Sequence, residues 1–395
     1  MIELCQTLAR NGQRGWVVGG CLRDILRGQP ASDWDLATDA RPEQVVKMFP
    51  RVIPTGIQHG TVTVRHRGNG YEVTTLRGEG AYSDGRRPDH VEYVSDIRED
   101  LSRRDFTINA LAYDPVADQL EDPFAGLDDL SAKLIRAVGE PERRFSEDGL
   151  RVLRAARFAA TLEFELDPAT EAAIAPTLPT FQRVSAERVR EEWLKALKAR
   201  QPSRAFRVMR RTGILAATYA ELAELDEAVF ERALDTVDAA REPIVRLAAL
   251  LYPLRARGVD AWLARYRFAN AERERVLRML RYAEPEGIVS AADVRRYARQ
   301  VGRAFLDEVT ELGALVGAEP LAERVRAIGD APLTTRELAL DGRTLMSELG
   351  LKPGPILGQL LELLLERVLD RPELNTREGL LALARTEYEA RAERE

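Results

Sequence analysis

The chain has 395 residues, of which 58 are basic and 64 acidic, so its formal charge is −6. Domains typically contain roughly 100–200 residues, so we expect two to four folded units. The apolar content of 45% and charged content of 31% are typical of a globular protein, and exclude a disordered or fibrous one. No apolar run reaches the ~18–20 residues that span a bilayer, and the first twelve residues lack the basic and apolar segments of a secretory signal. We therefore expect no membrane partner.

Cysteine and histidine are scarce. The chain contains only Cys5 and Cys21, and only His59, His66 and His90. Two cysteines exclude a disulfide framework or a cysteine zinc site, and they suit a reducing, cytoplasmic environment. Without an HExxH motif or a His–Asp cluster, zinc-hydrolase and metal-phosphohydrolase chemistry would have almost no ligands. The net acidity does not exclude a nucleic-acid partner, because binding depends on where the charges lie.

The composition changes near residue 130. Before it, β-branched runs alternate with glycine turns, and we expect the hairpin turn between two of these runs at Asn69-Gly70. Strands are predicted at 15–18, 33–38, 61–66, 71–77 and 91–94, with a helix at 21–28 after the first. From Glu147 onward the pattern is helical, with breaks at 176–179, 284–287 and 352–355 and a strongly apolar helix at 356–369. The pattern predicts an α+β protein, with a small mixed-sheet domain followed by a long helical extension.

The strongest local signal combines glycine and carboxylate residues. Gly19 and Gly20 lie at a predicted strand-to-helix turn, where backbone amides can approach a phosphate. Arg23 follows, and then Asp33 and Asp35. Residues two apart in a strand point to the same face, so these two carboxylates would lie side by side. A divalent cation such as Mg²⁺ would relieve their repulsion.

With these residues, the chain resembles the class II tRNA nucleotidyltransferases, or CCA-adding enzymes, which share a superfamily with DNA polymerase beta. Five segments resemble the family's motifs A to E, in the family's order: 19–35, 103–115, 122–139, 147–159 and 185–192. The resemblance covers nearly the whole chain. It implies a nucleotidyltransferase head with a mixed sheet, followed by an all-α neck, body and tail. We place these parts at residues 1–130, 131–200, 201–283 and 284–395, with tRNA binding in the tail.

The resemblance implies a role for each matching residue. Asp33 and Asp35 would hold Mg²⁺ ions that activate the tRNA 3′-hydroxyl and neutralise pyrophosphate, the two-metal arrangement. Glu72, on a neighbouring strand, is a candidate third catalytic carboxylate. The triphosphate and ribose would be bound by residues of the first two motifs, namely Gly19, Gly20, Arg23, Arg104, Asp105 and Asn109.

The fourth motif would select the base. Asp148 and Arg151 are three residues apart, so on a helix they would share a face, which Arg154 and Arg157 extend. A carboxylate accepts from the exocyclic amine of cytosine or adenine, while a guanidinium donates to their ring nitrogen. Uracil and guanine present the reversed pattern, and a good bidentate pair discriminates by about 1–3 kcal/mol. The protein could therefore act as its own template for C and A.

Two segments limit which product the enzyme is expected to make. Residues 53–64 resemble the CCA-adding type, whereas bacterial poly(A) polymerases usually carry a basic segment at this place. Residues 78–93 resemble the flexible loop that helps the family switch from C to A. We therefore expect CTP and ATP as substrates and tRNA as partner. An enzyme that adds only A, a poly(A) polymerase and a non-catalytic RNA-binding descendant remain the alternatives, and the oligomeric state is left open.

Overall fold

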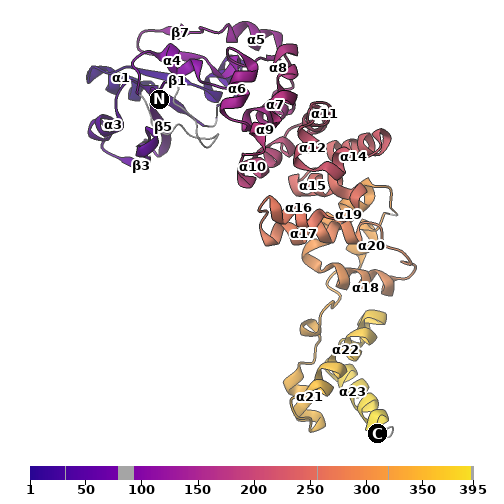
Figure 1. The fold of residues 1–395 in the computed structure, drawn as a ribbon. Helices are drawn as coiled ribbons and strands as arrows, with labels where there is room; N and C mark the ends of the chain where they lie inside the picture. The colour runs from indigo at the N-terminus through magenta and orange to yellow at the C-terminus, as the bar shows by residue number, and fades with distance from the viewer. Residues whose placement is uncertain (32, 79–92, 256, 319, 393–395) are drawn as a thin grey trace. The chain divides into compact units, whose positions relative to one another are not determined.

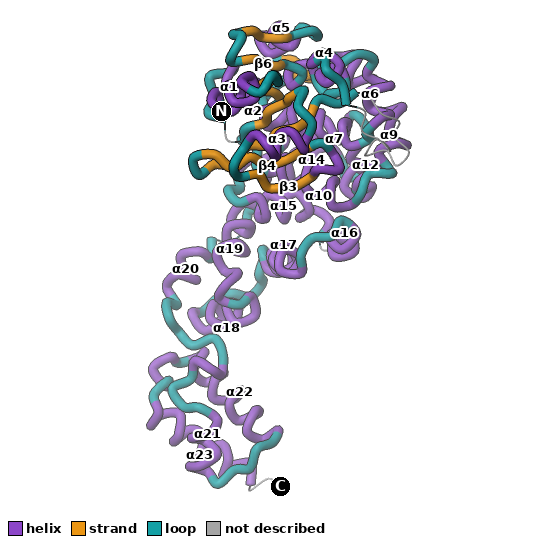
Figure 2. The backbone as a smooth tube through the Cα atoms, turned by 90° about the vertical axis from the view of Figure 1, so that its left-hand side faces the viewer, coloured by secondary structure: helices purple, strands orange, loops and turns teal. Residues whose placement is uncertain are grey.

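The computed structural model describes residues 1–31, 33–78, 93–255, 257–318 and 320–392. The chain divides into two compact units, Met1–Leu225 and Asp226–Glu395. In the described part of the chain, strands occur only in the first unit, and the second consists of helices and loops (Figure 2). The predicted α+β class is therefore confirmed. The finer division at residues 130, 200 and 283 stays a prediction.

The first unit is built on a mixed sheet. Among the described residues it has seven strands in the order β3-β4-β5-β2-β1-β6-β7, and only the β2–β5 pair is parallel. Figure 1 shows it near the N-terminus. The strands are β1 (Gly15–Val18), β2 (Asp35–Thr38), β3 (Val52–Gly56), β4 (Thr61–His66), β5 (Asn69–Thr75), β6 (Ala112–Asp114) and β7 (Gln119–Glu121).

Side chains alternate along the strands, so that core residues and candidate site residues lie on opposite faces of the sheet. Leu36 of β2 and Val73 of β5 point to one face of the sheet, where they are buried with Leu4 and Leu8 of α1 (Ile2–Arg10). Asp35, beside Leu36 in the chain, points to the opposite face, since successive side chains of a strand alternate. One face thus anchors the sheet while the other is available for chemistry.

The predicted hairpin turn is wrong by two residues. His66 pairs with Asn69, so Asn69 and Gly70 already belong to β5. The turn residues are Arg67 and Gly68, with φ of 48° and 84°. Two positive φ values are typical of a two-residue turn whose twist matches the flanking strands, and Gly68 adopts its value without steric cost.

The other helices of the first unit follow or interrupt the sheet. They are α2 (Gly20–Leu26), α3 (Pro42–Met48), α4 (Ile97–Ser102), α5 (Gly126–Ala132), α6 (Pro141–Glu147), α7 (Leu150–Thr161), α8 (Pro168–Ala172), α9 (Ile174–Phe181), α10 (Ala186–Leu197), α11 (Ser203–Arg211), α12 (Ile214–Thr218) and α13 (Ala220–Ala223). Two short strands, β8 (Leu134–Ile135) and β9 (Glu165–Leu166), pair in parallel between them. The predicted break at 176–179 is wrong, because α9 runs through it. Pro176 lies in the first turn of α9, where no intrahelical N–H bond is needed, and Pro179 sits inside the helix.

Helices and the loops between them make up the described residues of the second unit. Its helices are α14 (Glu227–Ala239), α15 (Pro243–Leu251), α16 (Val259–Arg265), α17 (Asn270–Tyr282), α18 (Ala291–Val301), α19 (Leu306–Leu315), α20 (Ala322–Ala327), α21 (Gly342–Leu349), α22 (Pro355–Asp370) and α23 (Arg377–Ala392). The predicted break at 284–287 falls between α17 and α18, and the one at 352–355 lies after α21 and ends at Pro355, the first residue of α22. Helix α22 is the predicted apolar helix. Among the described helices, none is both long and apolar enough to cross a bilayer.

Candidate active site

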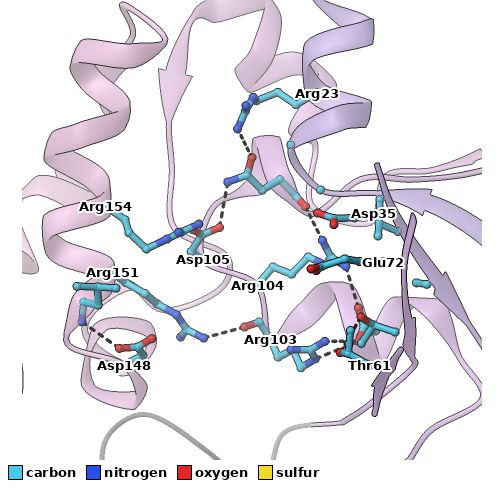
Figure 3. A pocket seen from close by; sticks show the side chains of 18 of the residues that line it. Arg23, Asp35, Thr61, Glu72, Arg103, Arg104, Asp105, Asp148, Arg151 and Arg154 are labelled. Carbon is cyan, nitrogen blue, oxygen red and sulfur yellow. Dashed lines mark hydrogen bonds and ion pairs between the residues drawn. The ribbon is translucent and has the colours of Figure 1, made fainter. Parts of the chain in front are cut away.

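A cavity of about 620 Å³ lies in the first unit, on the face of the sheet that carries Asp35 and Glu72 (Figure 3). Strands β2 and β5, helices α2 and α7 and the segment between α4 and β6 all contribute to it. Twelve of the thirteen predicted site residues line it: Gly19, Gly20, Arg23, Asp35, Glu72, Arg104, Asp105, Asn109, Asp148, Arg151, Arg154 and Arg157.

Asp35 and Glu72 form the acidic part of the cavity. They are partners in the parallel β2–β5 register, so both side chains lie on the same face. Burial, followed by the charge of Glu72, raises the pKa of Asp35 to about 6, and Arg104 opposes this rise. A Cβ built on Gly19 would lie 3.4 Å from Asp35 Oδ2 and 3.3 Å from Arg104 Nη1, so the glycine turn passes directly beside both groups. Its φ of 75° also favours glycine.

The position of Asp33 in the structure differs from the predicted one. Strand β2 begins at Asp35, so Asp33 precedes the strand in a bend, is exposed and does not line the cavity. The alternation argument, which assumed that both aspartates belong to one strand, is therefore wrong. The charge of Asp33 still contributes to raising the pKa of Asp35.

The donor chemistry fits a hard divalent cation. Asp35 and Glu72 offer carboxylate oxygens from adjacent strands, and their repulsion is what a cation would relieve. Within the described residues, no group of three or more histidine, cysteine, aspartate or glutamate side chains is already gathered for a metal ion. Mg²⁺ usually takes one or two carboxylates plus water and phosphate, so two protein carboxylates are compatible with it.

A hydrogen-bonded chain crosses the cavity from α2 to α7. Arg23 donates to Asn109 Oδ1 (2.7 Å), and Asn109 donates to Asp105 Oδ1 (3.1 Å). Asp105 Oδ2 accepts from Arg154 Nε at 2.8 Å. Burial would raise the pKa of Asp105, but Arg154 and Asn109 outweigh it and hold that pKa far below its usual range. Asp105 is therefore an ionised, oriented acceptor rather than an acid.

Asp148 and Arg151 meet in the cavity for a different reason from the predicted one. Asp148 lies between α6 and α7 with extended backbone, and its Oδ1 accepts from the N–H of Leu150 at 3.0 Å. Only Arg151 belongs to α7, in its first turn. The two residues therefore do not share a helical face, although both line the cavity (Figure 3).

Three comparisons with known proteins agree with this geometry. Family models match three stretches: the "Poly A polymerase head domain" over residues 15–136, the "Probable RNA and SrmB- binding site of polymerase A" over 163–225, and the "tRNA nucleotidyltransferase domain 2 putative" over 244–384. The CCA-adding enzyme of Lactobacillus delbrueckii subsp. bulgaricus is 37% identical over 93% of this chain and 92% of its own length. The chain belongs to the family of CCA-adding enzymes.

Other members of the family support the assignment. The CCA-adding enzyme of Lactiplantibacillus plantarum is 34% identical over 97% of this chain and 94% of its own. The crystal structure of the Bacillus stearothermophilus CCA-adding enzyme in complex with CTP matches with a TM-score of 0.83 and 31% identity, covering 100% of this chain and 98% of that chain. The similarity therefore extends through both units of the fold.

Sequence reasoning missed residues that hold these family motifs in place. Arg188 of α10 lines the cavity and donates to both oxygens of Asp148, at 3.2 and 2.7 Å. Glu192, one turn further along α10, pairs with Arg157 at 2.5 Å. Both lie in the fifth motif, which was identified only as a pattern, so its charged positions were the signal that could have found them. Most of the predicted flexible loop, 79–92, lies outside the described residues, as does half of the predicted strand at 91–94.

Proposed function

We propose that this cavity is the site at which the chain, a tRNA nucleotidyltransferase, transfers C and A nucleotides from CTP and ATP to the 3′ end of tRNA and releases pyrophosphate. The observation that carries this proposal is the meeting in one cavity of the acidic pair Asp35 and Glu72 with the candidate base-selecting pair Asp148 and Arg151. A nucleotide bound between them would have its reacting phosphate near the carboxylates and its base near α7.

A count of hydrogen-bonding capacity supports base selection by this pair. A carboxylate has about four lone-pair positions. The described contacts of Asp148 use three, one from Leu150 and two from Arg188. One position on Oδ2 is left, which suits one exocyclic amine. A carbonyl oxygen at the same place would be repelled, so uracil and guanine would be rejected.

Arg151 is held by three contacts and retains donors. Its Nη1 donates to the carbonyl of Arg144 at 2.6 Å and to Glu147 at 2.7 Å, and its Nη2 donates to the carbonyl of Arg103 at 2.8 Å. A guanidinium has five N–H donors, so two are not used by these contacts. Either could donate to the ring nitrogen of cytosine or adenine.

The remaining predicted roles belong to residues that line the same cavity. Arg23 and Arg104 would bind the triphosphate, with the Gly19-Gly20 turn, and Asp105 and Asn109 would bond the ribose hydroxyls. Asp105 is already bonded to Arg154 and Asn109, which supports a rigid acceptor for a hydroxyl group. Rigid placement lowers the entropic cost of aligning the reacting groups.

We propose Mg²⁺ as the cofactor, held by Asp35 and by Asp33, which lies in the bend before β2 but whose charge acts on Asp35, with Glu72 as a further catalytic carboxylate. Bound Mg²⁺ would supply activation of the attacking hydroxyl and charge neutralisation of the leaving pyrophosphate, in the two-metal arrangement. For this, Asp35 must be ionised, and its raised pKa means that protonation competes with the cation near pH 6.

We also propose that tRNA contacts the neck, body and tail through local arginine-rich surfaces, in the cytoplasm. Because the chain is net acidic, these contacts must be local, and the duplex would be recognised by shape and phosphates rather than by base sequence. Affinity for tRNA should then fall steeply between 50 and 200 mM salt through counterion release. Binding that is unchanged across this range would contradict a phosphate-based interface.

One assay tests the product. Purified protein is incubated with tRNA ending at the discriminator base, at C or at CC, with labelled CTP and ATP. We expect addition to all three ends, stopping after A. Addition only to the CC end would identify an A-adding enzyme, and long A tails would identify a poly(A) polymerase. The family comparisons favour the first outcome.

A further inference from the structure

Asp100 of α4 is a buried carboxylate that no predicted role uses. The residue is 1% exposed, yet its carboxylate receives donors from three residues. Its Oδ1 accepts from Arg103 Nη2 at 2.5 Å, from Arg103 Nε at 3.0 Å and from the N–H of Arg77 at 3.3 Å. Its Oδ2 accepts from Arg104 Nη2 at 3.1 Å. One carboxylate therefore binds the side chains of two consecutive arginines and the backbone of Arg77, which follows β5.

The first arm of this arrangement reaches the proposed triphosphate site. Arg104 Nη1 lies beside Gly19 and makes a long contact of 3.4 Å to the carbonyl of Asn109. Its Nε is buried and has no hydrogen-bond partner among the described residues. Asp100 is thus the carboxylate that pairs with Arg104 in the described ion pairs. Without it, the guanidinium would be held only by the long contact to the Asn109 carbonyl.

The second arm reaches the proposed base site. Arg103, held by Asp100, also donates from Nε to the carbonyl of Arg77 at 3.0 Å. The backbone carbonyl of Arg103 accepts from Nη2 of Arg151 at 2.8 Å. The Arg103 side chain therefore fixes the stretch of main chain on which Arg151 rests (Figure 3). A displacement of this main chain would displace a donor that faces the base.

We infer that Asp100 is a positioning residue that fixes Arg104 toward the triphosphate and, through Arg103, fixes Arg151 toward the base, so that both subsites share one anchor. The inference rests on the proposed roles of Arg104 and Arg151. Asp100 also lines the cavity, and the described hydrogen bonds of its carboxylate all go to Arg77, Arg103 and Arg104. Burial would raise the pKa of Asp100, but Arg103 and Arg104 outweigh it and lower that pKa, so the anchor is ionised at neutral pH.

The decisive variant is Asp100→Asn, which keeps the shape of the side chain but removes its charge. We expect kcat/KM for CTP on tRNA to fall about 100-fold, as for other small misplacements of positioned groups. The fall should appear largely as a higher KM and a weaker CTP dissociation constant. The ratio of UTP to CTP incorporation should also rise, because Arg151 loses its fixed support.

The matched control is Asp114→Asn. Asp114 is 4% exposed, pairs with Arg14 and accepts from backbone N–H groups of the same unit, but it does not line the cavity. A purely structural loss should lower stability, and the active fraction, in both variants alike. An Asp100→Asn protein whose KM and UTP to CTP ratio match those of Asp114→Asn would overturn the inference.

A double-mutant cycle separates this inference from the proposed function. If Asp100 acts through Arg104, adding Asp100→Asn to Arg104→Ala should weaken CTP binding less than Asp100→Asn alone does, because the Arg104 arm is already absent and only the Arg103 arm is left to lose. Additive losses would overturn the inference. If Arg104→Ala alone leaves CTP affinity unchanged, the proposed triphosphate role of Arg104 fails instead.

A further variant covers the case in which Asp100→Asn does not fold, as judged by circular dichroism. Arg103→Ala leaves the pair between Asp100 and Arg104 intact but releases the main chain under Arg151. We expect CTP affinity to fall less than in Asp100→Asn, because the Arg104 arm is kept, and the ratio of UTP to CTP incorporation to rise. An unchanged ratio would overturn the second arm of the inference.

Discussion

Arginine has different roles in the two units of this chain. In the first unit, guanidinium groups such as those of Arg23 and Arg151 are buried and line one cavity. In the second unit, Arg296 and Arg299 of α18 pair with acidic residues of α22 across a partly exposed surface, with Arg296 Nη2 2.6 Å from Asp370. The arginines of the two units carry the same charge, but they differ in how deeply the side chain is buried and in whether it points into a cavity or lies on the surface.

The difference shows how position decides what a charge contributes. Exposed ion pairs are screened by water and salt, and each stabilises a fold by only about 0–1 kcal/mol. Buried charges that point into a cavity are costly to ionise without partners, so they are held by networks and act strongly on a bound anion. Removing a charged residue of the cavity in the first unit should therefore lower catalysis strongly. Removing an exposed charged residue of the second unit should lower the stability of the fold only slightly.

The largest effect should come from the acidic part of the cavity. Asp35→Ala removes a proposed metal ligand, and we expect single-turnover nucleotide transfer to fall by about 10³-fold, equivalent to about 4 kcal/mol. Affinity for tRNA, measured by filter binding, should persist, because this carboxylate is proposed to hold the cation and not the RNA. Asp114→Asn serves as the folding control. Retention of more than a few per cent of turnover would rule out the ligand role.

A smaller and more selective effect is expected at the base-selecting pair. Asp148→Ala removes the repulsion of carbonyl groups and the partner of the amine. The ratio of UTP to CTP incorporation should rise by about 5- to 150-fold, which corresponds to 1–3 kcal/mol, while the CTP rate falls. Arg23→Ala should slow all four nucleotides equally, because a phosphate contact carries no base information. A common slowing in Asp148→Ala would place base selection elsewhere.

The buried carboxylate of Asp35 should also lower the stability of the folded protein when it is ionised, so this effect should depend on pH. Since the pKa of Asp35 is raised to about 6, its stabilising contribution is fully present below about pH 3.8 and is lost as pH rises through about 6. Asp35→Asn should therefore raise Tm at pH 7.5 with EDTA present, and this gain should shrink below pH 6. A gain that is independent of pH would show that ionisation of Asp35 is not the cause.

The smallest effect should be at the surface of the second unit. Arg299→Ala breaks pairs with Glu362 and Glu366, and we expect a loss of about 0.2–1 kcal/mol, seen as a small decrease in Tm. Arg295, on the same helix, is 9% exposed and donates to the carbonyls of Leu369 and Asp370. Arg295→Ala should cost more, about 1–3 kcal/mol, because the buried carbonyl of Leu369 loses its donor. Equal losses would contradict the contrast drawn from burial.

The sequence by itself determined the class of the fold and most of the site. Glycine turns, β-branched runs and helical periodicity predicted a mixed sheet before residue 130 and helices after it, because these patterns reflect local geometry. The same local patterns located the strand-to-helix turn at Gly19 and the apolar helix α22. Twelve of the thirteen predicted site residues line one cavity, and they could be predicted because the family motifs that carry them are local patterns in the sequence.

Only the tertiary structure decided how those residues are held. Asp33 falls outside β2, and Asp148 outside α7, because strand pairing and helix capping set element ends that periodicity does not specify. Arg188 reaches Asp148 from 40 residues away, and the Arg103 carbonyl meets Arg151 from 48 residues away. Such contacts arise from packing between elements that are distant in the chain. A motif can mark charged positions such as Arg188, but its spacing along the sequence does not say which distant residue each position contacts.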